Sequence, residues 1–157
     1  MTPNDYINIV NQRYQAGNAT EHSYRGDLQQ LLQTLLPDVD VTNEPKRIDC
    51  GAPDYILSRK EIPVGYIEAK DVGVELGAKI HQAQFNRYKA ALGNLIITDY
   101  LQFHFYKQGQ LVASCNIGEI SNGKVLNKIG KCIKILRVGK YFATAHFTNG
   151  TTRHQLA

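Results

Sequence analysis

Apolar side chains recur at helical spacing in two stretches near the start of the chain. Residues 3–16 follow Thr2, a residue type that caps helix N-termini, and this pattern stops at Gly17. Residues 21–36 follow Thr20, and a proline closes this second stretch. The sequence therefore predicts two amphipathic helices. Their apolar stripes are Tyr6, Ile9, Val10 and Tyr14 in the first helix and Tyr24, Leu28, Leu31, Leu32 and Leu35 in the second.

The next segments are short and rich in β-forming residues. Residues 39–42, 54–57 and 63–69 predict three strands, and the polar stretch 58–61 predicts a hairpin turn between the last two.

Helical spacing returns at 75–92 and is followed by apolar, aromatic segments at 94–98 and 101–107, which predict two more strands. The order α-α-β-β-β-α-β-β is typical of an α/β domain with a mixed central β-sheet flanked by helices. The buried side of the third helix is expected to comprise Leu76, Ile80, Phe85, Tyr88 and Leu92.

The composition fits one globular domain. The 157 residues are 43% hydrophobic and 20% charged, which excludes global disorder. No apolar run is long enough to span a membrane and no basic-then-apolar segment opens the chain, so we expect a cytoplasmic protein with no membrane partner. The cysteines form no Cys-x-x-Cys pair, which argues against a structural zinc site, and we expect reduced, small buried hydrophobes. They are Cys50, Cys115 and Cys132.

The formal net charge of +4 is unevenly distributed. Residues 1–120 carry 11 basic and 14 acidic side chains, whereas residues 121–157 carry 7 basic and no acidic ones. Such a tail suits contact with a polyanion, and it also suits a solvated flank. Its structure stays open between a hairpin, with strands at 131–138 and 141–147, and a helix with one basic face. The basic positions of that helix would be Lys128, Lys131, Lys134 and Arg137.

The sharpest chemical hypothesis concerns two carboxylates of the predicted hairpin. Glu68 and Lys70 alternate along one strand, so their side chains share a face. If the turn is centred near Glu61, Asp54 lies directly across from Glu68. Two close carboxylates repel unless a cation lies between them, and an all-oxygen site suits Mg²⁺ or Mn²⁺. Because such an ion activates water and Lys70 can stabilise charge on a phosphate, these residues suggest phosphodiester hydrolysis.

An acid two residues before a lysine is also a common chance arrangement. Glu44-Pro45-Lys46 has the same spacing, although a proline fits poorly in a paired central strand. The pair by itself is therefore a weak signal, and an unrelated α/β domain with a chance motif stays open.

The residues around the pair are more specific. Pro53-Asp54, three apolar residues, a short turn and residues 64–70 (VGYIEAK) together resemble the core of PD-(D/E)XK, or restriction-endonuclease-like, nucleases. Gln84 and Tyr88 match the Gln-x-x-x-Tyr element of one branch of that family, and at this spacing they share a helix face. Further segments resemble the N-terminal nuclease domain of single-polypeptide restriction-modification enzymes of types IIG and ISP. These segments are residues 20–25, 43–46, 51–54 and 94–100.

The resemblance implies roles for the matching residues. Asp54 and Glu68 would be metal ligands, and Lys70 the catalytic lysine. Glu21 would complete the metal shell or would simply be a charge favoured at a helix N-terminus, and Gln84 would reach toward the metal or the DNA backbone. The candidate DNA contacts, which include the basic positions of the tail, are His22, Arg25, Lys46, Tyr88, Lys131, Lys134 and Arg137.

The family implies a Mg²⁺-dependent DNA endonuclease, with Mn²⁺ as a substitute ion. The resemblance covers residues 15–112, so we expect a nuclease-like core at 1–112 and an unassigned basic extension at 113–157. The chain shows no helicase phosphate loop, methyltransferase motif or target-recognition domain. The expected partners are therefore DNA, further domains of a longer restriction-modification protein, and a second copy of the chain for cutting both strands. The alternative is a non-cleaving DNA-binding or interaction module with the same fold.

Overall fold

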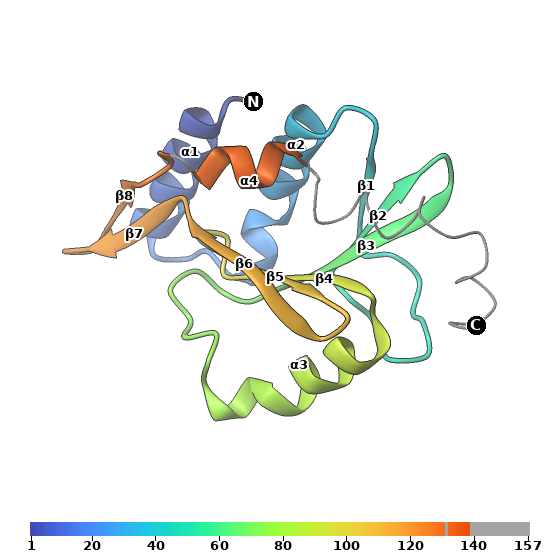
Figure 1. Cartoon of the computed structure of the whole chain (residues 1–157). Coiled ribbons are helices and arrows are strands. Elements are labelled where there is room, and N and C mark those ends of the chain that lie inside the picture. Colours follow the sequence, from blue (N-terminus) through green and yellow to red (C-terminus); the bar gives the residue numbers. More distant parts are fainter. Residues whose placement is uncertain (131, 139–157) are drawn as a thin grey trace.

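A six-stranded mixed β-sheet forms the centre of the computed structural model, which describes residues 1–130 and 132–138 (Figure 1). The strands lie in chain order from β1 to β6; β3 and β4 run parallel, and the other neighbouring pairs are antiparallel. The strands are β1 (Asp40–Asn43), β2 (Tyr55–Arg59), β3 (Ile62–Ala69), β4 (Asn94–Thr98), β5 (Gln102–Lys107) and β6 (Gln110–Asn116).

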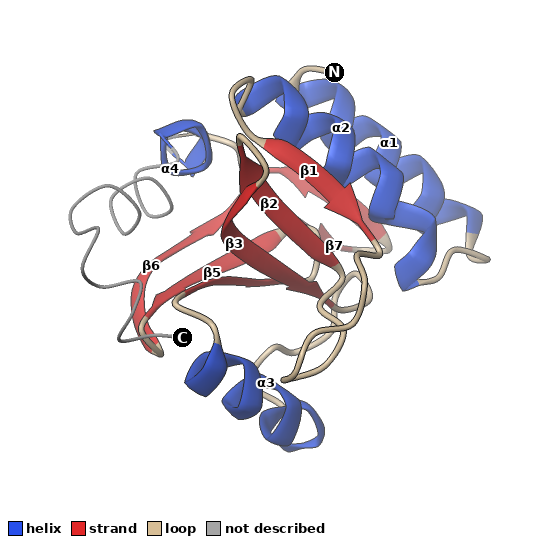
Figure 2. Ribbon diagram, turned by 90° about the vertical axis from the view of Figure 1, so that its right-hand side faces the viewer, coloured by secondary structure: helices blue, strands red, loops and turns tan. Residues whose placement is uncertain are grey.

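Helices cover both faces of this sheet (Figure 2). Helices α1 and α2 lie against one face and α3 lies against the other, which confirms the predicted mixed sheet flanked by helices. None of the helices in the described part of the chain is long and apolar enough to cross a membrane. The helical elements are α1 (Pro3–Ala16), the 3-10 helix η1 (Glu21–Tyr24), α2 (Arg25–Leu35), α3 (Lys79–Ala91) and α4 (Cys132–Val138).

The N-terminal helices begin where the sequence predicts them. The Thr2 hydroxyl accepts the backbone N–H of Asp5, whose carboxylate accepts the N–H of Thr2, and this reciprocal capping box starts α1. The helix ends at Gly17, which has a φ of 76° and therefore a left-handed backbone. The second helical stretch opens with one turn of 3-10 helix, η1, so α2 itself starts at Arg25.

Strand β4 shows how the two layers share the core. Leu95 and Ile97 pack beneath α3, whereas Ile96 belongs to the larger cluster beneath α1 and α2. Burial on both faces is typical of a strand in the parallel part of a sheet, with helices on each side. Strand β3, which pairs with β4, therefore lies in the middle of the domain.

The β2–β3 hairpin turns through a two-residue loop. Lys60 and Glu61 have φ values of 49° and 64°, the left-handed backbone that a type I′ turn requires at both positions. The polar turn predicted at residues 58–61 is therefore confirmed.

A β-bulge within this hairpin sets the register of its far end. Past the bulge, Tyr55 lies opposite Ile67, so the next position along the pair brings Asp54 to Glu68. A one-residue slip would turn one of these side chains to the opposite face of the sheet. The bulge therefore places two carboxylates on one face, as the sequence predicts.

Helix α3 begins later than predicted. Residues 71–78 form turns rather than helix, and α3 starts at Lys79. Ile80, which was expected in the core, is 84% exposed. At 100° per residue, Ile80 lies about 110° around the helix from the middle of the face that Phe85 and Tyr88 bury.

The hydrophobic core continues beyond residue 112. Strand β6 extends to Asn116, and the hairpin of β7 (Gly118–Ser121) and β8 (Lys124–Asn127) packs against α1 (Figure 1). Ile117 and Val125 belong to the main core cluster. Residues 113–127 thus take part in the domain core.

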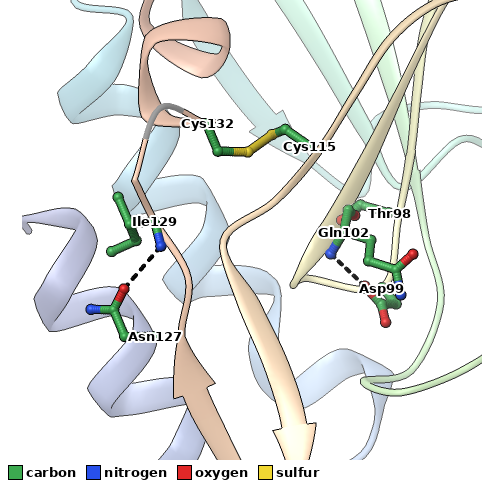
Figure 3. The surroundings of a disulfide bond; sticks show 7 residues. All are labelled: Thr98, Asp99, Gln102, Cys115, Asn127, Ile129 and Cys132. Atoms are coloured by element: carbon green, nitrogen blue, oxygen red, sulfur yellow. Dashed lines mark hydrogen bonds between the residues drawn. A yellow bond between two sulfur atoms is a disulfide. The ribbon is translucent and has the colours of Figure 1, made fainter.

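The C-terminal segment decides one open question and corrects one expectation. Of the two structures that the sequence leaves open there, residues 132–138 form the helix and not the first strand of a hairpin, because Cys132 and Leu136, four positions apart, face the core together. Cys115 and Cys132 are joined in a disulfide, with Cα atoms 5.4 Å apart, instead of being reduced thiols (Figure 3). Folding brings the end of β6 beside the start of α4, which their separation in sequence does not indicate.

The basic candidates of the tail are described only in part. Lys134 is exposed on α4. Lys131, the side chain of Arg137 and the segment 141–147 lie outside the described residues.

Candidate active site

Asp54, Glu68 and Lys70 meet at one edge of the sheet, where β2 begins and β3 ends. Glu68 is 3% exposed, and its Oε1 accepts a hydrogen bond from Lys70 Nζ at 2.9 Å. Asp54 is 8% exposed, and its Oδ2 accepts the backbone N–H of Ala69 at 2.8 Å. The structure thus brings together three of the residues that the sequence predicts to take part in catalysis.

Arg25 is a second cation at this edge. Its Nη2 donates to Asp54 Oδ1 at 2.5 Å and to Glu21 Oε1 at 3.1 Å, and its Nη1 donates to Glu44 Oε1 at 2.7 Å. The side chain is 9% exposed. One guanidinium therefore joins three carboxylates from η1, from the end of β1 and from the start of β2.

Buried tyrosines fix the backbone that carries Arg25. The Tyr55 hydroxyl donates to the carbonyl of Arg25, and the Tyr100 hydroxyl donates to the carbonyl of Glu21, both at 2.8 Å. Tyr6 on α1 in turn donates to the carbonyl of Tyr100 at 2.8 Å. These long-range bonds hold the start of α2 against the sheet edge where the carboxylates lie.

Helix α3 closes the other side of the site. Lys70 Nζ lies 5.8 Å from the centre of the Phe85 ring. Gln84 precedes Phe85 and is half-buried, and its role at the metal or at DNA stays a prediction. Tyr88 is 1% exposed, and a Cβ on Gly51 would come within 2.8 Å of its hydroxyl oxygen. Tyr88 is therefore a packing residue, and the predicted DNA contact is wrong because the side chain is buried.

The remaining candidate DNA contacts fall into two groups. Arg25 is buried and paired with carboxylates, so it is part of the site and not an exposed phosphate contact. His22 and Lys46 are exposed, and His22 Nδ1 lies 3.7 Å from Glu44 Oε1. Their contact with phosphates stays a prediction.

Burial governs the protonation of the two central carboxylates. Burial, followed by the neighbouring charge of Asp54, raises the pKa of Glu68 to about 7, and Lys70 opposes this rise. Burial also raises the pKa of Asp54, against the opposing effects of the Ala69 N–H and of Arg25. Arg25 and Lys70 therefore do not fully offset the cost of burying two ionised carboxylates at this site.

The donor atoms fit a hard divalent cation. In the described part of the chain, Glu68 Oε2 is among the few buried side-chain polar atoms that have no hydrogen-bond partner. No three His, Cys, Asp or Glu side chains of the described residues form a group that could hold a metal ion, and Glu21, the expected third ligand, is paired with Arg25. Mg²⁺ is commonly held by one or two carboxylates, with water completing its shell. Asp54 and Glu68 suit that mode of binding.

Sequence reasoning missed the bridging position of Arg25 and the contribution of Glu44. The four-residue spacing of Glu21 and Arg25 is a local signal for their ion pair. The contacts of Arg25 with Glu44 and Asp54 span 19 and 29 residues, so no local pattern indicates them. Glu44, part of the chance motif in the sequence, proves to lie at the site.

Comparison with known proteins bears on the fold. No family model matches this chain, and no curated protein matches its sequence. Among solved structures, the chain is similar to part of DrdV, determined by cryo-electron microscopy in complex with DNA, with a TM-score of 0.67 and 19% sequence identity. The similarity covers 90% of this chain and 14% of the DrdV chain. The chain therefore shares the fold of that part of DrdV, and its mixed sheet with flanking helices is consistent with the restriction-endonuclease-like fold expected from the sequence.

Proposed function

We propose that this chain is the cleavage domain of a Mg²⁺-dependent DNA endonuclease that hydrolyses phosphodiesters with Asp54, Glu68 and Lys70. The observation that carries the proposal is the meeting of these three side chains where β2 begins and β3 ends. Asp54 and Glu68 are buried there, and one carboxylate oxygen of Glu68 has no hydrogen-bond partner among the described residues. The DNA in the DrdV complex, a protein that shares this fold, supports DNA as the substrate.

The charge balance of the site supports a divalent ion. Four carboxylates, on Glu21, Glu44, Asp54 and Glu68, face two cations, on Arg25 and Lys70. When all six groups are ionised, two negative charges stay uncompensated. An ion of charge +2 between Asp54 and Glu68 would neutralise this excess and favour the ionised form of Glu68.

The chain's own residues divide the chemistry among them. A divalent ion held by Asp54 and Glu68 would polarise the phosphate and lower the pKa of bound water. Lys70 Nζ, fixed by Glu68 Oε1 and beside the Phe85 ring, can donate a hydrogen bond to the phosphate or orient the attacking water. Hydrolysis then adds one water across a P–O ester bond.

The recognition of a DNA sequence would lie elsewhere. The chain spans 14% of the length of the DrdV chain to which it is similar. We therefore also propose that this domain acts within a longer restriction-modification protein, whose other domains choose the cleavage site, or that two copies act together to cut both strands.

A plasmid-cleavage assay tests the proposed function. Supercoiled plasmid is incubated with the purified chain and Mg²⁺, Mn²⁺ or a chelator, and nicked and linear products are measured. We expect metal-dependent cleavage, and we expect Lys70→Gln to lower its rate roughly 100-fold to 1000-fold because the substitution removes the ammonium beside the phosphate. The matched control is Lys60→Gln in the β2–β3 turn, at the opposite end of the same hairpin, which should cleave at the wild-type rate.

The non-cleaving alternative predicts a different set of results. A binding module would shift plasmid mobility with no cleavage under any metal condition, and Lys70→Gln would leave DNA affinity nearly unchanged. Cleavage at the wild-type rate by Lys70→Gln, with its fold intact by circular dichroism, would reject the assignment of Lys70.

A further inference from the structure

The guanidinium of Arg25 holds one carboxylate that the proposed metal site also needs. Its Nη2 lies 2.5 Å from Asp54 Oδ1, and the other oxygen of Asp54 already accepts the Ala69 N–H. Both oxygens of Asp54 are thus in use, whereas Glu68 has one oxygen in use and one unpaired in the described part of the chain. Among the described residues, Asp54 therefore has no oxygen without a hydrogen bond, whereas Glu68 has one oxygen that an ion could bind without displacing another partner.

The position of Arg25 is imposed by the fold. Tyr55 and Tyr100 anchor the backbone at both ends of the η1 turn, and Glu21 and Glu44 hold the guanidinium from two further sides. A side chain that is 9% exposed and bound to three carboxylates has little freedom to leave. Arg25 thus places a fixed positive charge directly beside Asp54.

We infer that Arg25 is a positioning residue. It serves as the resident counter-cation of Asp54 and thereby sets how tightly the site binds a divalent ion. This inference rests on the proposed function, since it assumes that Asp54 and Glu68 hold the ion. The positive charge of Arg25 repels a divalent cation at short range, and its hydrogen bond occupies a carboxylate oxygen that the ion needs. Glu44 acts in the opposite sense, because its negative charge partly neutralises Arg25 from the exposed side.

Metal titration of charge variants tests this inference without relying on cleavage. Mn²⁺ and Mg²⁺ are titrated into the metal-free chain by isothermal calorimetry. We expect Arg25→Gln to bind Mn²⁺ at least tenfold more tightly than wild type, because the substitution removes the repelling charge. Arg25→Lys should stay within about threefold of wild type, because it keeps the charge while losing the three-way contact.

Glu44→Gln provides the matched change of opposite sign. Its side chain is 64% exposed, so the substitution is compatible with the fold, and it should weaken Mn²⁺ binding about threefold. The double variant Arg25→Gln/Glu44→Gln restores the wild-type charge balance and should return the affinity toward the wild-type value. Thermal melting with and without Mn²⁺ gives a second readout, and Arg25→Gln should show the larger stabilisation by the ion.

The outcomes separate the inference from the function on which it rests. If Asp54→Asn abolishes Mn²⁺ binding while Arg25→Gln binds as weakly as wild type or more weakly, the proposed metal site stands and the role of Arg25 is overturned. If neither wild type nor Arg25→Gln binds Mn²⁺ in a carboxylate-dependent way, both proposals fail. Should Arg25→Gln not fold, an unchanged affinity in Glu44→Gln overturns the inference.

Discussion

Two buried acids lie at the ends of neighbouring strands of the same sheet, and their oxygens have different hydrogen-bond partners. Asp99, directly after β4, is 1% exposed, and its oxygens accept backbone N–H groups from Gly73, Leu101 and Gln102. Glu68, near the end of β3, is 3% exposed, and among the described residues it has one ammonium partner and one oxygen without a partner. Burial raises the pKa of both side chains.

The difference shows which buried carboxylate is available for chemistry. The hydrogen-bonding capacity of Asp99 goes to the backbone of its own turn and of the loop after β3, so Asp99 organises the chain. Glu68 has a buried acceptor atom that nothing in the described part of the chain satisfies, and such an atom is costly unless a ligand uses it. A raised pKa is common to both, so the pKa alone does not distinguish a structural acid from a functional one.

Removing the carboxylate of Asp99 should have the largest effect on stability. Asp99→Ala leaves three backbone N–H groups without their acceptor, and we expect the free energy of unfolding to fall by about 3 kcal/mol. Urea unfolding followed by circular dichroism measures the change. Asp49→Ala, at an exposed loop position, is the control and should stay within about 0.5 kcal/mol of wild type. An equally small loss for Asp99→Ala would show that Asp99 does not stabilise the fold, and the contrast with Glu68 would not hold.

Removing the charge of Glu68 should instead stabilise the metal-free protein relative to wild type as the pH rises. In the metal-free protein the pKa of Glu68 is about 7, above the ordinary value of 4.5, so the folded state binds more protons than the unfolded state between these values. The wild-type free energy of unfolding should therefore fall as the pH rises through this window. Glu68→Gln lacks this titration, so its stability relative to wild type should rise by about 3 kcal/mol from pH 4.5 to pH 8.

Urea unfolding in the presence of a chelator at several pH values checks the prediction. Glu61→Gln, in the exposed hairpin turn, is the matched control and should show no such pH-dependent gain. If Glu68→Gln follows the wild-type pH profile, Glu68 is already stabilised as an anion and the contrast with Asp99 does not hold.

The local parts of the site were predictable from the sequence. Alternation along β3 and into the next residue puts Glu68 and Lys70 on one face, and the hairpin brings Asp54 across from Glu68 as predicted. The hairpin reaches this register through a β-bulge that the sequence did not predict. The fold class was predicted in the same way, from the order of helical and strand patterns along the chain. Each of these inferences depends on residues that are close in sequence or are related by a single hairpin.

The parts that escaped prediction depend on long-range contacts. Arg25 binds Asp54 across 29 residues, and Cys115 pairs with Cys132 only because β6 and α4 meet in the folded domain. The start of α3 was predicted too early because Leu76 and Ile80 have helical spacing. Leu76 is buried, but it lies in the loop before α3, and Ile80 is exposed. Spacing reports a face only where the backbone is already helical.

Asp99→Asn should have the smallest effect, and it sharpens the comparison most. The amide oxygen of asparagine can still accept the N–H groups of Leu101 and Gln102, and what is lost is the longer bond from Gly73, at 3.3 Å. We expect the free energy of unfolding to change by less than about 1 kcal/mol, because the loss of this weak bond is partly offset by the removal of a buried charge. Urea unfolding beside Asp99→Ala measures the difference. A loss as large as that of Asp99→Ala would mean that the turn needs the negative charge of Asp99 itself and not only an acceptor atom. Asp99 would then resemble Glu68 more closely than its hydrogen bonds indicate.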